Sequence, residues 1–88
     1  MKIAEIETIP IRLPTRRVHQ WASLTTPIGV YVIIKMHTDE GLVGLGETYP
    51  HPEAEKAIIH HSLAPVLLGR DPLAIDRLWA DMFQAISY

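Results

Sequence analysis

The sequence contains no cysteine, so it offers neither a disulfide framework nor a thiolate for catalysis or metal binding. No apolar run approaches the ~20 residues of a membrane-spanning helix. Glu5 and Glu7 interrupt the amino-terminal stretch where a signal peptide is apolar. The formal net charge is only −2, which favours neither nucleic acid nor an anionic membrane as a partner. These absences indicate a cytoplasmic protein without nucleic-acid or membrane partners.

Common cofactor-binding signatures are also missing. The chain has no P-loop, dinucleotide fingerprint or nucleophile elbow, and the pair Gly44 and Gly46 is too short to form one. What remains is a chain of 88 residues that is 48% hydrophobic. This length and composition indicate one small folded domain rather than a disordered segment.

Residues 30 to 50 carry the most informative pattern, a β-hairpin with a glycine-rich end. Apolar, mostly β-branched residues alternate along its first strand, as in a half-buried sheet. The sequence Thr-Asp-Glu-Gly then favours a three-residue turn with Gly41 in the left-handed conformation. The return strand covers residues 42 to 48 and carries Gly44 and Gly46 on one face. Paired glycines in a strand predict that another group packs close to the backbone there.

The segment before the hairpin is expected to contain a strand and a long loop. The strand covers residues 2 to 13, with a bulge near Glu7 because the apolar alternation changes phase there. Residues 14 to 29 show no clear period, and we interpret them as a loop. Loops this long in compact domains are usually functional or disordered. Trp21 within it is costly to leave in water, so we expect its ring to pack on another group.

The carboxy-terminal half predicts helices. Pro52 and the glutamates after it favour a helix from about residue 52 to residue 63. Pro65 is expected to end or kink this helix, and Gly69 to cap it.

A second helix is expected to begin with Asp71 as its N-cap and Pro72 as its first residue. The apolar residues that follow it recur at spacings of three and four, which is the strongest helical signal in the chain. They are Ile75, Leu78, Trp79, Met82, Phe83 and Ile86. The expected fold class is therefore α+β: a three-stranded antiparallel meander followed by two or three packed helices.

Glu47 is the strongest candidate for a functional carboxylate, because it follows two glycines at a strand end, beside Thr48 and Tyr49. An exposed strand-end carboxylate with no special role is an equally good interpretation. The other acidic residues have sufficient explanations as turn, helix-start or solvated positions.

The five histidines do not predict a metal site in this chain. His60 and His61 are neighbours on a helix, so they point about 100° apart and cannot chelate one ion together. His19 lies in the long loop near Trp21, where it serves either as surface polarity or as a contact to a substrate.

Two motifs give the chain a specific resemblance. One is Asp39-Glu40-Gly41, followed five residues later by Gly46-Glu47. The other is Gly69-Arg70-Asp71-Pro72, followed by the apolar residues of the second helix. With the strand before them, these motifs resemble the N-terminal capping domain of the enolase superfamily, in its mandelate racemase and muconate lactonizing enzyme branch. The resemblance covers essentially residues 1–88.

The resemblance implies a cap that lies over a barrel domain. In the family, a Lys or His base removes a proton α to a carboxylate, and Mg²⁺ stabilises the enediolate that forms. The base and metal ligands stand on barrel strands, which need about 200 or more residues, so none is expected in this chain. The cap selects the substrate. By analogy, the substrate-specificity residues are His19, Trp21, Glu47 and Tyr49.

The cap of the family continues beyond the part that this chain matches, so residues 1–88 are expected to form an incomplete capping domain. Its parent would be a racemase, cycloisomerase or acid-sugar dehydratase that acts on a small carboxylate, and a homo-oligomer. We expect the chain alone to be inactive and to expose an apolar face that the barrel normally covers. The alternative is a non-enzymatic module that oligomerises or binds a small ligand.

Overall fold

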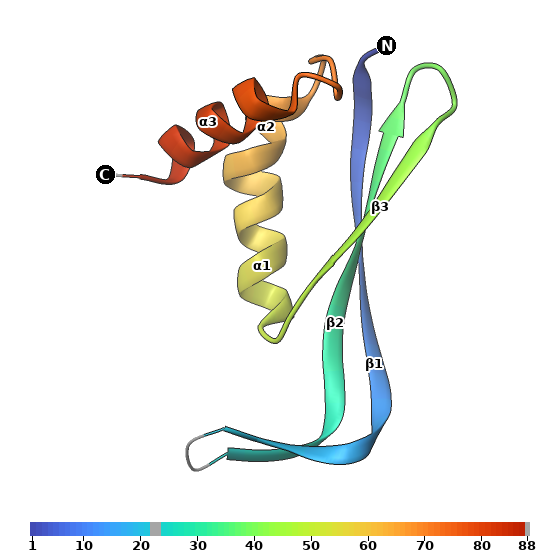
Figure 1. The fold of residues 1–88 in the computed structure, drawn as a ribbon, viewed down its shortest axis with the longest axis vertical. Coiled ribbons are helices and arrows are strands. Elements are labelled where there is room, and N and C mark those ends of the chain that lie inside the picture. Colours follow the sequence, from blue (N-terminus) through green and yellow to red (C-terminus); the bar gives the residue numbers. More distant parts are fainter. Residues whose placement is uncertain (22–23, 88) are drawn as a thin grey trace.

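Three strands and a set of helices make up the chain (Figure 1). The computed structural model describes residues 1–21 and 24–87, and it defines only the backbone of residues 14–21 and 24–28. The strands β1 (Ile3–Trp21), β2 (Leu24–Thr38) and β3 (Val43–Thr48) form an antiparallel sheet in the order β1-β2-β3. The helical segments are α1 (Pro52–Ile58), η1 (Ile59–Leu63), α2 (Ala64–Leu67) and α3 (Ile75–Ile86). The predicted α+β meander with packed helices is confirmed.

The turn between β2 and β3 has the predicted form. Gly41 has a φ of 85°, the left-handed conformation that glycine adopts at no steric cost. The Thr38 backbone N–H donates to the Leu42 carbonyl at 3.0 Å, and the Leu42 N–H donates to the Thr38 hydroxyl at 3.1 Å. The Met1 amine also reaches this turn and lies 2.9 Å from the Glu40 carboxylate. The hydrogen bond that the Met1 amine donates to Glu40 raises the pKa of this amine above its ordinary value.

The expected loop over residues 14 to 29 is wrong, because residues 14–21 and 24–29 continue the hairpin of β1 and β2. His19 pairs with Thr26 and Trp21 with Leu24, after an irregularity between Pro14 and His19. We call residues 14–21 and 24–28 the distal ribbon; it extends away from the helices (Figure 1). Beyond the end of β3 the described sheet has only two strands. Without a third strand, alternation of apolar and polar residues is not required there, and the sequence shows none.

The first helix differs from its prediction in extent. The helical path continues past residue 63 to Leu67, and its π-helical stretch η1 comes directly before Pro65. Proline cannot donate a backbone hydrogen bond and its ring clashes with the preceding turn, so a wider turn accommodates it. Gly69, with a φ of 81°, ends the path as predicted. Its N–H donates to the Ile3 carbonyl at 2.8 Å, which joins this helix end to β1.

The predicted start of the second helix is wrong, since α3 begins at Ile75 and not at Pro72. Asp71 caps a turn instead of the helix. Its carboxylate accepts the Leu73 N–H at 2.9 Å, and its carbonyl accepts the Ala74 N–H at 3.2 Å. Aspartate readily makes this local bond to the backbone two residues on, which competes with helix initiation.

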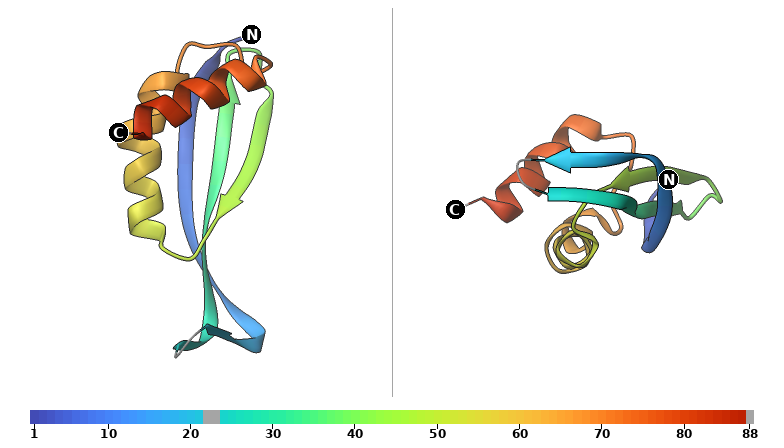
Figure 2. Two further views of the ribbon diagram at one scale, coloured as in Figure 1. Left: turned by 60° about the vertical axis from the view of Figure 1, so that its left-hand side comes forward. Right: turned by 90° about the horizontal axis from the view of Figure 1, so that it is seen from below.

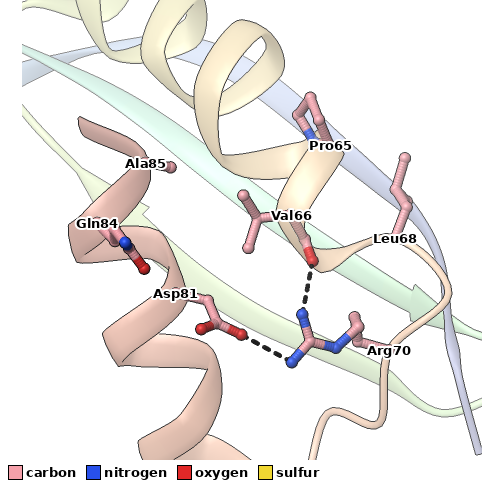
Figure 3. Close-up of a pocket in the computed structure, with 7 residues that line it drawn as sticks. All are labelled: Pro65, Val66, Leu68, Arg70, Asp81, Gln84 and Ala85. Atoms are coloured by element: carbon pink, nitrogen blue, oxygen red, sulfur yellow. Dashed lines mark hydrogen bonds and ion pairs between the residues drawn. The ribbon is translucent and has the colours of Figure 1, made fainter. Parts of the chain in front are cut away.

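Arg70 connects the two helices that flank this turn (Figure 3). Its guanidinium donates to the Asp81 carboxylate of α3 at 2.8 Å and to the Val66 carbonyl of α2 at 3.3 Å. The two charged side chains are 38% and 34% exposed, so water screens their attraction. The pair fixes the angle between the helices more than it adds stability.

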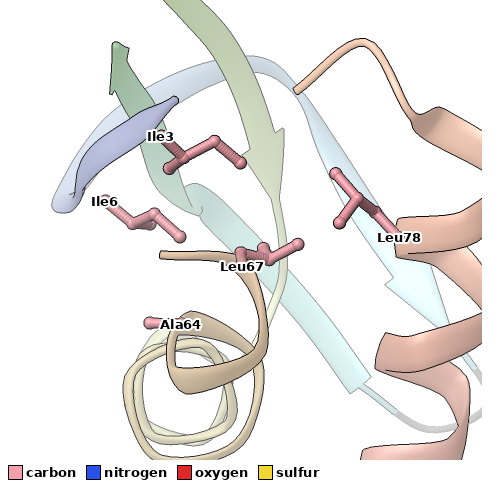
Figure 4. Packing of buried hydrophobic residues seen from close by; sticks show 5 residues of the cluster. All are labelled: Ile3, Ile6, Ala64, Leu67 and Leu78. Atoms are coloured by element: carbon pink, nitrogen blue, oxygen red, sulfur yellow. The ribbon is translucent and has the colours of Figure 1, made fainter. Parts of the chain in front are cut away.

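The core lies between the sheet and the helices (Figure 4). Its buried residues are Ile3, Ile6, Ala64, Leu67 and Leu78. Ile3 and Ile6 both face it, although an odd spacing normally puts strand residues on opposite faces. The register between β1 and β2 shifts between Ile3 and Glu5, so the bulge is at Ala4 rather than near Glu7 as expected. The extra residue turns Ile3 toward the core.

Helix α3 buries only one edge of its apolar stripe. Leu78 is 5% exposed, whereas most other members of the stripe face solvent. We call these exposed residues the outer face of α3: Ile75 (69%), Trp79 (61%), Phe83 (56%) and Ile86 (48%). The rings of Trp79 and Phe83 stack with centroids 5.3 Å apart. The expected exposed apolar face is confirmed. Within the described ranges, no helix has the length and apolar character to cross a membrane.

Candidate functional site

The register of the sheet fixes where Glu47 lies. Gly46 pairs with Ile34, which packs against the core, and Glu47 pairs with Ile33. Because successive strand residues point to opposite faces, Glu47 projects from the sheet face that is turned away from the helices. Its side chain is exposed, at the end of β3. This position leaves the carboxylate free to meet another domain or a ligand.

Tyr49 follows β3 on the same side and is 58% exposed. Its ring lies beside that of Tyr31 in β2, with centroids 5.7 Å apart and planes tilted by 46°. Tilted rings at this distance attract one another through their quadrupoles. Sequence reasoning did not single out Tyr31. Counting outward from the predicted turn at Gly41 places Tyr31 opposite Tyr49, so the signal was present in the hairpin register.

His19 and Trp21 have defined backbones in the distal ribbon, but their side chains fall outside the described part of the chain. The expectation that the Trp21 ring packs on another group falls outside it too. The ribbon and the connection from β3 to α1 lie toward the same end of the molecule (Figures 1 and 2). Thr48 pairs with Val32, eight residues after Leu24 in β2, so β2 extends for roughly 26 Å of strand length beyond its pairing with β3. The four predicted residues thus share one end of the sheet, with Glu47 and Tyr49 adjacent and the other two farther out.

Gly44 and Gly46 are bare on the side that faces the helices. A Cβ added to either glycine would meet no described atom within 4 Å. The expectation that a group packs against them is therefore not met by any described atom of this chain. Both lie on the outer strand β3, whose Leu45 is 74% exposed on the opposite face.

Two histidines have side-chain partners among the described residues. The His60 Nε2 lies 2.7 Å from the Thr8 hydroxyl and joins η1 to β1. The His37 Nε2 lies 3.0 Å from the Glu7 carboxylate across the sheet. Among the residues searched, which exclude the undescribed ones, no three His, Asp or Glu side chains gather closely enough to hold a metal ion. These residues do not fit a magnesium site.

Glu55 caps the first helix, because its Oε2 accepts the His51 backbone N–H at 3.0 Å. This arrangement satisfies a donor that the start of a helix otherwise leaves without a partner. The predicted helix-start role of Glu55 is confirmed.

A shallow hollow lies between α2 and α3 (Figure 3). Its lining consists of Pro65, Val66, Leu68, Arg70, Asp81, Gln84 and Ala85. The two charged members of this lining already bind each other at 2.8 Å. The hollow therefore has less to offer a charged ligand than the exposed end of β3.

Comparison with known proteins agrees with this geometry. Residues 4–88 match the family described as "Mandelate racemase / muconate lactonizing enzyme, N-terminal domain". A chloromuconate cycloisomerase from Cupriavidus pinatubonensis is 35% identical in an alignment of 86 residues that covers 88% of this chain and 23% of that protein. A D-galactonate dehydratase from Verminephrobacter eiseniae is 40% identical in an alignment of 60 residues that covers 66% of this chain and 15% of that protein.

A solved structure is similar in fold as well. The N-succinyl Arg/Lys racemase from Bacillus cereus superposes with a TM-score of 0.89 and 31% identity, over 98% of this chain and 25% of that one. The chain thus spans a quarter or less of the length of these three proteins. The match to the N-terminal domain covers nearly every residue. The chain belongs to the mandelate racemase / muconate lactonizing enzyme family.

Proposed function

We propose that residues 1–88 form the substrate-specificity cap of an enzyme that removes a proton α to a carboxylate. One observation carries this proposal: the exposed end of β3 and the distal ribbon lie toward the same end of a domain that matches the family's N-terminal part. Two segments at one end can border a single ligand site. A cap of this kind selects the substrate and excludes water from it.

The chemistry itself is proposed to come from a barrel domain outside these residues. The described carboxylates and histidines do not gather into a magnesium site. The base and the ligands of Mg²⁺ are therefore assigned to the barrel. The related proteins include a racemase, a cycloisomerase and a dehydratase, and we propose that the parent enzyme carries out one of these reactions.

Four residues are proposed to face the substrate: His19, Trp21, Glu47 and Tyr49. Glu47 offers an exposed negative charge, which suits hydroxyl or amino groups of a small carboxylic acid. Tyr49 offers a large exposed ring whose tip donates and accepts hydrogen bonds. We further propose a cytoplasmic homo-oligomer, supported by the absence of cysteine and by the outer face of α3.

A second candidate function is a non-enzymatic module that oligomerises. The outer face of α3 favours it, because four large apolar side chains remain about half or more exposed. Exposed apolar patches of this kind mark interaction sites on proteins. Such a module would associate through α3 and would need no barrel domain.

Solvent isotope exchange tests the proposal directly. The purified 88-residue chain is incubated with Mg²⁺ in D₂O with D-galactonate and with N-succinyl-lysine, and the α-proton signal is followed by NMR. We expect no loss of the signal beyond the protein-free control, because the proposal assigns the base and the metal ligands to the barrel domain. Exchange catalysed by the chain alone would refute the proposal.

Sedimentation tests the association through α3 that both candidates share, and the effect on the specificity of a barrel partner separates them. Two results together favour the non-enzymatic module. The chain forms an oligomer that Trp79→Asp dissociates, and it does not alter the specificity of any barrel partner. A matched change on the polar side of α3, Gln84→Asp, controls for the added charge.

A further inference from the structure

An aromatic ring lies directly over a glycine at the base of the distal ribbon. Gly29 is buried, and a Cβ added to it would lie 2.5 Å from Cε2 and 2.7 Å from the hydroxyl oxygen of Tyr31. Contacts below 3.0 Å do not occur for real Cβ atoms. Gly29 and Tyr31 are two apart in β2 and so share one face of the sheet. The missing side chain at position 29 is what lets the ring occupy this space.

The same ring touches the end of β3. Its centroid is 5.7 Å from that of Tyr49, the residue that follows the last pair between β2 and β3 by one position. Tyr49 is 58% exposed, so water surrounds most of its ring and the contact with Tyr31 supplies much of its support. Tyr31 therefore contacts two places: the base of the ribbon at Gly29, and the connection that leads to α1.

We propose that Tyr31 is a positioning residue that sets the orientation of Tyr49 relative to the distal ribbon, with Gly29 providing the space for its ring. Tyr31 acts through Tyr49 and does not itself contact the ligand. A change at Gly29 is then transmitted to Tyr49, although the two residues lie on different strands. The consequence for specificity rests on the proposed function, because it requires that Tyr49 faces the substrate. The contact between Tyr31 and Tyr49 does not depend on the proposed function.

Four variants of the 88-residue chain test the contact: Tyr31→Phe, Tyr31→Leu, Gly29→Ala, and Gly29→Ala combined with Tyr31→Leu. The readouts are the NMR shifts of the Gly29 α-protons and of the Tyr49 ring. We expect the α-protons of Gly29 to be shifted by the ring above them in the wild type and in Tyr31→Phe. Tyr31→Leu should abolish that shift and move the Tyr49 ring signals, because the aromatic pair is lost.

The double variant supplies the decisive control. Gly29→Ala alone should move the Tyr49 signals, because the new Cβ displaces the Tyr31 ring. With Leu at position 31 the ring is gone, so adding Gly29→Ala should leave the Tyr49 signals where Tyr31→Leu put them. Two results overturn the proposal: wild-type Gly29 α-protons without a ring shift, or a Gly29→Ala effect on Tyr49 of equal size in both backgrounds. If Tyr31→Leu does not fold, two measurements still test the proposal. One is the ring shift of the Gly29 α-protons in the wild type. The other is the comparison of the Tyr49 ring signals between Gly29→Ala and Tyr31→Phe.

The enzymatic consequence has a separate outcome. In a polypeptide that includes the barrel, Tyr31→Leu should change KM and the preference between substrates, and Tyr31→Phe should restore both. If the ring shifts behave as expected and specificity does not change, the positioning of Tyr49 stands and the proposed role of Tyr49 at the substrate fails.

Discussion

Leu78 gives the sharpest test of how the helices are held to the sheet. Its side chain is 5% exposed and packs in the same cluster as Ile3 and Leu67. Replacing a buried leucine by alanine costs about 2–5 kcal/mol. The cluster has only five buried members and solvent lies close by, so it can partly collapse, and we expect about 3 kcal/mol for Leu78→Ala. A chain of this length has a total stability of roughly 4–13 kcal/mol, so the loss is a large share of it.

The adjacent residue provides the matched control. Trp79 is larger than Leu78 but 61% exposed, and its described contacts include the stacked ring of Phe83. We expect Trp79→Ala to cost about 1 kcal/mol, the value of one aromatic pair. Urea unfolding followed by far-UV circular dichroism measures both variants, and 3 kcal/mol corresponds to a midpoint shift of about 2 M. Equal losses for the two variants, or a larger loss for Trp79→Ala, would refute the packing described here.

Three further predictions concern the turn, the chain terminus and the ribbon. Gly41→Ala should destabilise the chain by about 1–2 kcal/mol in urea unfolding, because the φ of Gly41 is 85°. Gly44→Ala is the control and should be neutral or slightly stabilising, because its new Cβ would meet no described atom. The reverse order would contradict the turn geometry. The Met1 amine has a raised pKa, so its contribution to stability is present below about pH 8 and is lost as pH rises through the folded-state value. Glu40→Gln should remove this alkaline decline in the urea midpoint, and an unchanged decline would assign it to another group. Amides of the distal ribbon should exchange with deuterium faster than those of the three-stranded part of β2, because two strands protect less than three. Equal rates would contradict this difference in protection.

Much of the fold could be predicted because local signals agreed with one another. The turn at Gly41 followed from residue chemistry, and the hairpin register followed from the turn. The end of the first helical path followed from Gly69. The predictions failed where two local preferences competed. Asp71 is favourable both as a helix N-cap and as the first residue of a local turn, and it forms the turn. The ion pair of Arg70 between α2 and α3 belongs to tertiary structure that local patterns do not encode.

The candidate site was predicted less completely. Glu47 and Tyr49 were singled out because they end a recognisable strand, and the register places them on the same face of the sheet. Their role at the substrate stays a prediction. The ribbon was mistaken for a loop, since its residues show no clear hydrophobic period in the sequence and it extends beyond the third strand. Tyr31 was not singled out because its contact with Tyr49 emerges only when the two strands are aligned from the Gly41 turn.

The central claim is that this chain selects a substrate for chemistry performed by another domain. The most direct test replaces the N-terminal domain of the Bacillus cereus racemase, whose fold this chain shares with a TM-score of 0.89, by residues 1–88. The ratio of kcat/KM for two carboxylate substrates is then compared between this chimera and its parent. The account predicts an active, folded chimera with a changed ratio that Glu47→Gln changes again. A folded, active chimera that keeps the parental ratio would contradict it.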